Sequence, residues 1–181
     1  MKAEIIKRKP LSGRFTQKHF GDQNKPGLYV KFTDNGHNKW IGCFAKADLN
    51  GHCQVITDNY GSQCLIVANG KGYLVDIETE SVLKEFDEQN HITSALHTSN
   101  PSYFVAGTEN SIFIINDEGL LKEIYADFVV DGFHMKQQHE NSVSGWLDSS
   151  INEFENAIDF KIDLSSFNLI VNIENKNVEY C

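Results

Sequence analysis

Two stretches of equal length carry the same pattern: LIVANGKGYLVDIETESVLKEF, which is Leu65–Phe86, and YFVAGTENSIFIINDEGLLKEI, which is Tyr103–Ile124. They align without a gap at a constant offset of 38 residues, so that Val67 lies over Val105. Each stretch predicts three strands separated by two turns, because runs of β-branched and aromatic residues are interrupted by turn formers. Units of this kind that recur about every 40 residues are typical of the antiparallel blades of a propeller.

Weaker copies of the unit lie on both sides of this pair. Phe160–Ser166 aligns with Tyr73–Thr79, after a longer hairpin over Asn141–Asn156, and Leu28–Phe44 with Gln54–Thr57 resembles an opening copy. We therefore expect an all-β chain of antiparallel β-meander repeats of about 38 residues in a partial or small propeller. A two-sheet β-sandwich is the alternative. A homodimer that completes the propeller is a further option.

The predicted organisation is a single domain over residues 1–181, with repeat-like β units at 28–57, 63–86, 101–125 and 128–170. Residues 1–27 are basic and rich in turn formers, and Pro10 and Gly13 interrupt any regular pattern. This leader is predicted to be mostly loop, with one short strand near Glu4–Lys7.

Charge divides unevenly along the chain, whose formal net charge is −9. Residues 1–50 contain ten Lys or Arg against four Asp or Glu, whereas residues 51–181 contain six against twenty-one. An acidic surface repels phosphate backbones, so we expect no nucleic-acid partner and a basic protein partner instead. The alternative is that this charge serves only solubility.

The predicted location is the cytoplasm. The longest apolar runs span only a few residues, against the roughly 20 that a membrane-spanning helix needs, so no membrane association is expected. The basic N-terminus is not followed by the apolar core of a signal peptide. The chain has four cysteines without metal-ligand spacing, and they are expected to be free thiols: Cys43, Cys53, Cys64 and Cys181.

Motifs of catalysis are missing from the sequence. It contains no GxSxG, HExxH, GxxxxGK[ST] or GxGxxG pattern, so we expect no enzyme activity and no cofactor. His91 and His97 would share one face of a strand, but no third metal ligand is evident. His134 and His139 are five residues apart, and a regular strand would place them on opposite faces. No metal site is therefore predicted.

The acidic segments Asp76–Glu80 and Asn116–Gly119 occupy the same turn of the repeat. Asp, Asn and Gly are favoured there for backbone reasons, and neither segment has the pattern of a calcium loop. Five aromatic residues in apolar runs are expected in the core: Trp40, Phe44, Tyr73, Phe104 and Phe113.

The C-terminal half contains a segment rich in acidic and aromatic residues. Carboxylates can steer a basic protein toward such a segment, and aromatic rings can anchor it. The alternative is an edge hairpin that carries charge for solubility. The residues predicted to contact a partner are the following: Trp146, Asp148, Glu153, Phe154, Glu155 and Asp159.

Several short motifs carry a resemblance to known proteins. They are Trp40–Phe44 (WIGCF), Leu65–Val67, Gly70–Asp76 (GKGYLVD), Asp131–Phe133 and Gly145–Trp146. In this order the chain resembles small uncharacterised bacterial proteins with propeller-like β repeats, some of which resemble immunity proteins of contact-dependent or polymorphic toxin systems. The resemblance implies a non-enzymatic protein that neutralises a cognate basic toxin, for instance a nuclease, by stoichiometric occlusion. The alternative is a propeller-like interaction or scaffold module without a toxin partner.

Overall fold

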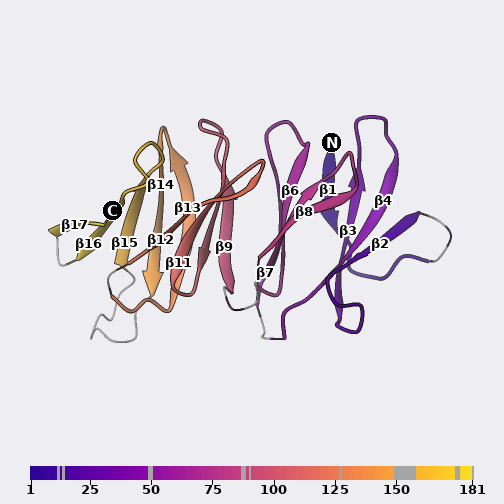
Figure 1. Ribbon diagram of the computed structural model, residues 1–181, viewed down its shortest axis with the longest axis horizontal. Coiled ribbons are helices and arrows are strands. Elements are labelled where there is room, and N and C mark those ends of the chain that lie inside the picture. The colour runs from indigo at the N-terminus through magenta and orange to yellow at the C-terminus, as the bar shows by residue number, and fades with distance from the viewer. Residues whose placement is uncertain are drawn as a thin grey trace. The chain divides into compact units, whose positions relative to one another are not determined.

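Strands and turns make up the part of the chain that the structure, a computed structural model, describes: residues 1–11, 13, 15–48, 51–86, 89, 91–126, 128–148, 158–173 and 176–180. These residues contain no helix, and their strands form four sheets (Figure 1). Three sheets are antiparallel meanders whose strands follow one another in chain order. The all-β class with propeller-like meander repeats is thus confirmed. No helix in the described ranges is long and apolar enough to cross a bilayer.

The chain divides into two compact units, Met1–His91 and Ile92–Cys181. In the first unit, one sheet has the order β1-β3-β4-β2 and the other is the meander β5-β6-β7-β8. The strands are β1 (Lys2–Ile5), β2 (Thr16–Phe20), β3 (Gly27–Thr33), β4 (Lys39–Ala45), β5 (Cys53–Thr57), β6 (Gln63–Ala68), β7 (Lys71–Asp76) and β8 (Ser81–Phe86). The single-domain organisation stays a prediction.

The second unit consists of the meanders β9-β10-β11-β12 and β13-β14-β15-β16-β17. Its strands are β9 (Ile92–His97), β10 (Phe104–Thr108), β11 (Ser111–Asn116), β12 (Gly119–Tyr125), β13 (Gly132–His139), β14 (Ser142–Asp148), β15 (Ile158–Asp163), β16 (Leu169–Ile173) and β17 (Lys176–Tyr180).

The N-terminal leader contains two strands, so the prediction of one strand was wrong. β1 lies at Lys2–Ile5, and the second strand, β2, pairs in parallel with β4. The sequence of β2, TQKHF, lacks an apolar alternation, and Phe20 anchors it by stacking on Phe44 at a ring distance of 5.1 Å. The predicted unit 28–57 is also divided, because β5 pairs with β6 and belongs to the second sheet.

The repeat is present in the structure with one difference in length. The β-bulge at Leu74/Val75 in the β7–β8 pair corresponds to the one at Ile114/Ile115 in β11–β12, an offset of 40, whereas the last strands keep the offset of 38. The extra two residues lie in the turn after β7. Because strand side chains alternate with a period of two, an error of two leaves every residue on its correct face.

In each meander, an Asp or Asn side chain at the same position forms the turn from the third to the fourth strand. The Oδ1 atoms of Asp76, Asn116 and Asp163 accept backbone N–H groups two or three residues later, at 2.7–3.1 Å. These Asx turns confirm that the acidic segments serve the backbone. The hydrogen bonds from Ser166 and Ser165 hold the pKa of Asp163 below its usual value.

In the first unit, the two sheets pack around buried aromatic rings. Trp40 Nε1 donates to Ile77 O at 3.2 Å, and Tyr73 OH donates to Ala45 O at 2.7 Å, so each sheet binds the backbone of the other. The rings of Phe32 and Trp40 stack at 4.0 Å. All five aromatic residues predicted for the core are buried: Trp40, Phe44, Tyr73, Phe104 and Phe113.

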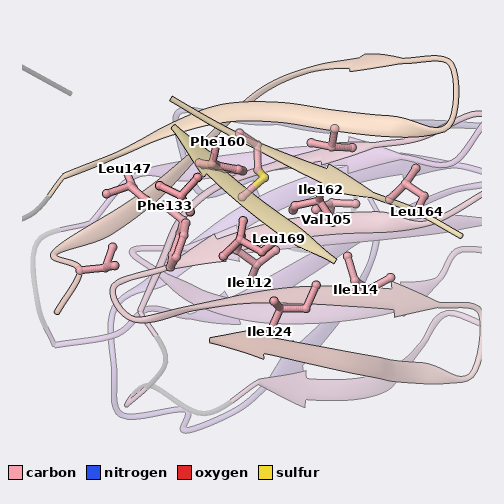
Figure 2. Packing of buried hydrophobic residues seen from close by; sticks show 14 of the residues in the cluster. Val105, Ile112, Ile114, Ile124, Phe133, Leu147, Phe160, Ile162, Leu164 and Leu169 are labelled. Carbon is pink, nitrogen blue, oxygen red and sulfur yellow. The ribbon is translucent and has the colours of Figure 1, made fainter. Parts of the chain in front are cut away.

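The two sheets of the second unit form an aliphatic core around two phenylalanines (Figure 2). Phe133 on β13 is fully buried and meets Phe160 on β15 edge to face at 5.5 Å. Val105, Ile112 and Ile114 pack against them from β10 and β11. Burial of the inner faces of both sheets leaves the alternate residues of β13, β14 and β15 on the outer face.

An acid-sensitive ion pair joins β1 to β3. The Glu4 carboxylate lies 2.8 Å from Lys31 Nζ and 3.0 Å from Lys2 Nζ, which lowers its pKa to about 2. Because this pKa lies below the unfolded value of 4.5, the pair stabilises the fold above that value and is lost as the pH falls toward 2. We expect Glu4→Gln to reduce the loss of stability in this pH window, measured by urea unfolding. An unchanged pH profile would show that the pair contributes nothing.

Candidate functional site

Three of the predicted partner-binding residues lie together on the outer face of the last sheet. Trp146 on β14 pairs directly with His134 on β13 and with Asp159 on β15, and Asp148 follows on the same face of β14. We call His134, Trp146, Asp148 and Asp159 the Trp146 face. The other three predicted residues, Glu153, Phe154 and Glu155, lie outside the described residues.

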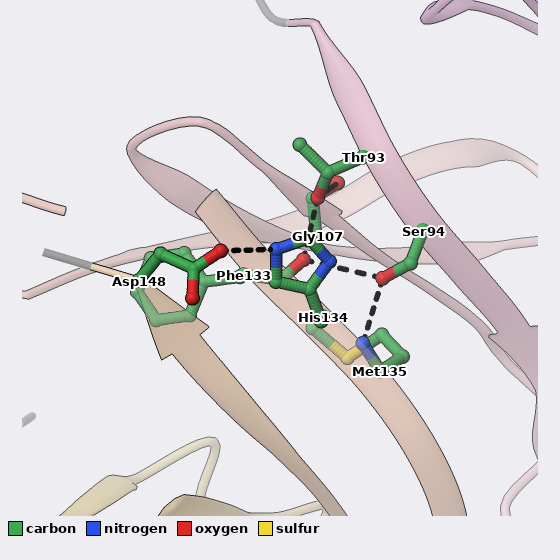
Figure 3. A network of polar contacts seen from close by, with 7 residues as sticks. All are labelled: Thr93, Ser94, Gly107, Phe133, His134, Met135 and Asp148. Atoms are coloured by element: carbon green, nitrogen blue, oxygen red, sulfur yellow. Dashed lines mark hydrogen bonds and ion pairs between the residues drawn. The ribbon is translucent and has the colours of Figure 1, made fainter. Parts of the chain in front are cut away.

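The Trp146 face consists of an aromatic stack with a carboxylate at its edge, and Figure 3 shows the contact of this carboxylate, Asp148, with His134. The His134 ring lies parallel to the Trp146 indole, with ring centroids 5.2 Å apart and planes inclined by 13°. His134 Nε2 is 2.9 Å from Asp148 Oδ2, an ion pair when the imidazole is protonated. Trp146 is 36% exposed and the Asp148 side chain 55% exposed, so both are accessible to a partner.

Gly132 makes room for this arrangement. It pairs with Asp148, and a Cβ at this position would lie 3.2 Å from His134 Nε2 and 3.5 Å from Thr93 Cγ2. A side chain here would therefore crowd the imidazole that bonds the carboxylate. The glycine leaves the His134–Asp148 pair uncovered toward solvent.

Two hydroxyl groups of β9 fix the backbone of β13 on either side of His134 (Figure 3). Thr93 Oγ1 donates to Phe133 O at 2.6 Å, and Ser94 Oγ accepts from Met135 N at 2.6 Å. β9 and β13 belong to different sheets, so these side chains tie the two sheets of the unit together. The position of the His134 ring is thus set by its neighbours along the strand.

Replacement of Ser94 by alanine tests this connection. The variant leaves Met135 N–H without its acceptor, and an unsatisfied polar group costs about 1–3 kcal/mol of unfolding free energy. We expect a loss in this range by urea denaturation, together with a shifted imidazole resonance of His134. Ser144→Ala is the matched control, because the Ser144 hydroxyl makes only an exposed 3.4 Å contact with Gln137 O. Equal losses in both variants would contradict the assignment.

His134 was missed as a site residue because its partner Trp146 becomes visible only in the pairing of β13 with β14. The register of β13 with β14 shifts between Met135 and Gln137, so one extra residue is inserted into the strand. His134 and His139 pair with Trp146 and Ser142, which share one face of β14. The expectation that the two histidines lie on opposite faces was therefore wrong.

The other histidine pair does not share a strand. β9 begins at Ile92, so His91 precedes it, whereas His97 ends it and packs its ring against Phe104 at 4.9 Å. His97 Nε2 lies 3.1 Å from Ser102 Oγ. Among the described residues, no three His, Cys, Asp or Glu side chains group as metal ligands.

The net negative charge of the protein comes from the unit that carries the Trp146 face. The second unit contains four lysines and no arginine against fourteen Asp or Glu, a net charge of −10. The first unit contains twelve Lys or Arg against eleven Asp or Glu, a net charge of +1. The electrostatic potential that a charged partner meets near the Trp146 face is therefore negative.

Comparison by sequence finds no relative of this chain, because no protein-family model and no curated protein matches it. Among solved structures it is similar to the hydrazine synthase of Kuenenia stuttgartiensis, with 14% identity and a TM-score of 0.38 over 74% of this chain and 51% of that one. It is also similar to the Pan2 WD40 domain of Neurospora crassa, with 12% identity and a TM-score of 0.46 over 80% and 54%.

The chain spans about half the length of these two structures. Likeness at these scores carries no argument about activity or partner. The fold assignment therefore rests on the strand order and register described above.

Proposed function

We propose that this chain is a non-enzymatic protein-interaction module that binds a basic protein segment on the Trp146 face. The observation that carries the proposal is the half-exposed Trp146 indole, flanked on its own strand by Asp148 and on the next strand by Asp159. Tryptophan is the residue most enriched among the energetic centres of protein interfaces.

An arginine side chain fits this chemistry best. Its planar guanidinium stacks on an aromatic ring and can pair with a carboxylate at the same time. On the Trp146 face, Asp159 lies directly across the ladder from the indole. A guanidinium above the ring could therefore reach a carboxylate without moving the backbone.

The face is pre-organised, which lowers the entropic cost of binding. Ladder pairs fix Trp146 on both sides, and the β9 hydroxyls fix the strand that carries His134. The net charge of −10 on this unit supports long-range attraction of a cationic partner. These properties are those of a binding surface for a basic protein.

The finer form of the proposal is an immunity protein that acts in the cytoplasm. In this form the basic partner is a toxin domain, for instance a nuclease, whose substrate groove is covered one-to-one by the acidic unit. The same charge and the exposed indole support a scaffold role with a harmless partner equally well. Co-expression with the captured partner distinguishes the two. A toxin partner expressed alone inhibits growth, and this chain then restores it, whereas a scaffold partner does not inhibit growth.

The test is a tagged pull-down from the cells of origin, washed through a salt gradient and analysed by mass spectrometry. Wild-type protein is compared with Trp146→Ala and with Tyr125→Ala, which removes another exposed aromatic ring of the same unit. We expect a basic protein in one-to-one ratio with wild type and Tyr125→Ala that is lost with Trp146→Ala. Retention of the same proteins by all three would refute binding at the Trp146 face.

A further inference from the structure

A pocket in the first unit has no part in the proposed function. It is a cavity of about 200 Å³ between β2, β3, β4 and the loop that joins β2 to β3. Its polar residues come from the segment before β2, from the loop between β2 and β3, and from one cross-strand row of the sheet. They are Lys9, His19, Asp22, Gln23, Lys25, Tyr29 and Cys43.

The floor of the pocket is the row His19–Cys43–Tyr29. Cys43 on β4 pairs with Tyr29 on β3 and with His19 on β2, so the three side chains share one face. Gly27 keeps this space open, because a Cβ there would lie 2.2 Å from Cys43 Sγ. The cavity thus depends on a glycine beside a buried thiol.

The groups on the lining are mainly hydrogen-bond donors. Tyr29 and Cys43 share a side-chain hydrogen bond, and burial raises the pKa of both, so the hydroxyl and the thiol stay protonated near neutral pH. Lys9 and Lys25 add two cations. Lys25 Nζ is held 3.1 Å from Asp48 Oδ2, a contact that fixes its position.

One carboxylate also lines the pocket, and one of its two oxygens is engaged within the loop. Asp22 Oδ1 accepts from Asn24 N at 2.9 Å and from Asn24 Nδ2 at 3.0 Å. These bonds close the loop on itself, and the two lysines, His19 and Gln23 supply donors. A lining of this kind complements an anion with several acceptor oxygens.

We propose that this pocket binds a small tetrahedral oxyanion of the phosphate class. Drug-sized ligands occupy cavities of about 300–1,000 Å³, so a cavity of about 200 Å³ suits a small anion better than a whole nucleotide. Lysine ammonium groups bind phosphate oxygens as point charges. The site lies in the first unit and does not depend on the Trp146 face.

Titration with inorganic phosphate at constant ionic strength, against chloride, tests the pocket by the amide resonances of Gly27 and Cys43. We expect saturable shifts with phosphate alone, weakened about tenfold in Lys9→Gln. Lys39→Gln is the matched control, because it removes the same charge from the exposed first residue of β4, which does not line the pocket. Thermal unfolding of each variant confirms that it is folded.

Two results would overturn the proposal. Phosphate shifts no larger than those of chloride would mean that the pocket does not select this anion. Equal weakening by Lys39→Gln and Lys9→Gln would mean that the anion responds only to overall charge.

Discussion

Trp146→Ala lowers the affinity for an arginine-rich peptide by at least about 30-fold, equal to about 2 kcal/mol at 25 °C. The substitution removes the indole on which a guanidinium can stack within the Trp146 face, while the β14 backbone stays paired on both sides. Fluorescence anisotropy of a labelled peptide measures this loss directly. Trp146→Phe should retain part of the affinity, because a smaller ring still stacks.

The carboxylates of the Trp146 face should contribute less and depend more on salt. Asp148 is exposed and bonds His134, and Asp159 is exposed beside the indole. We expect about three- to tenfold weaker binding in Asp159→Asn, decreasing as salt screens the charge. Tyr125→Ala is the control for an exposed ring on another strand. Affinity unchanged in Trp146→Ala, or reduced equally in Tyr125→Ala, is incompatible with the proposed anchor.

Phe133→Ala should lower the free energy of unfolding by about 3–5 kcal/mol. Phe133 is fully buried, meets the Phe160 ring at 5.5 Å and packs in the core of the second unit. Alanine removes these contacts and leaves a cavity that the rigid sheets cannot close. Urea unfolding monitored by circular dichroism measures the effect.

Leu121→Ala is the control for Phe133→Ala, because Leu121 is 45% exposed on β12 of the same unit. Its unfolding free energy should change by no more than about 0.5–1 kcal/mol. A cost below about 1 kcal/mol for Phe133→Ala would show that this core is not packed as described.

The faces of the repeat strands could be predicted from the sequence, whereas their partners in space could not. Val67 and Val105 are both buried although the ungapped alignment is wrong by two residues in this strand, because both faces of β6 and β10 are buried. The Asx turns at Asp76 and Asn116 were predictable because they use contacts within three residues. β2 was missed since only Phe20 marks it.

Three of the four residues of the Trp146 face could be predicted, whereas the fourth and its support depended on contacts between strands. Trp146, Asp148 and Asp159 were selected by residue type, and the ladder brings them together. His134 required the pairing of β13 with β14, which places it opposite Trp146, whereas the bulge that follows changes the face of His139. Ser94 contacts Met135 across 41 residues, a relation that no local pattern contains.

The most direct test of binding at the Trp146 face uses the two tryptophans of the chain as probe and internal control. Trp146 is 36% exposed, whereas Trp40 is 1% exposed and donates its indole N–H to Ile77 O. In a nitrogen-15 NMR titration with an arginine-rich peptide, the Trp146 indole signal should move saturably and respond to salt while the Trp40 signal stays in place. A Trp146 signal that stays unmoved at millimolar peptide, or moves only with that of Trp40, would contradict the account.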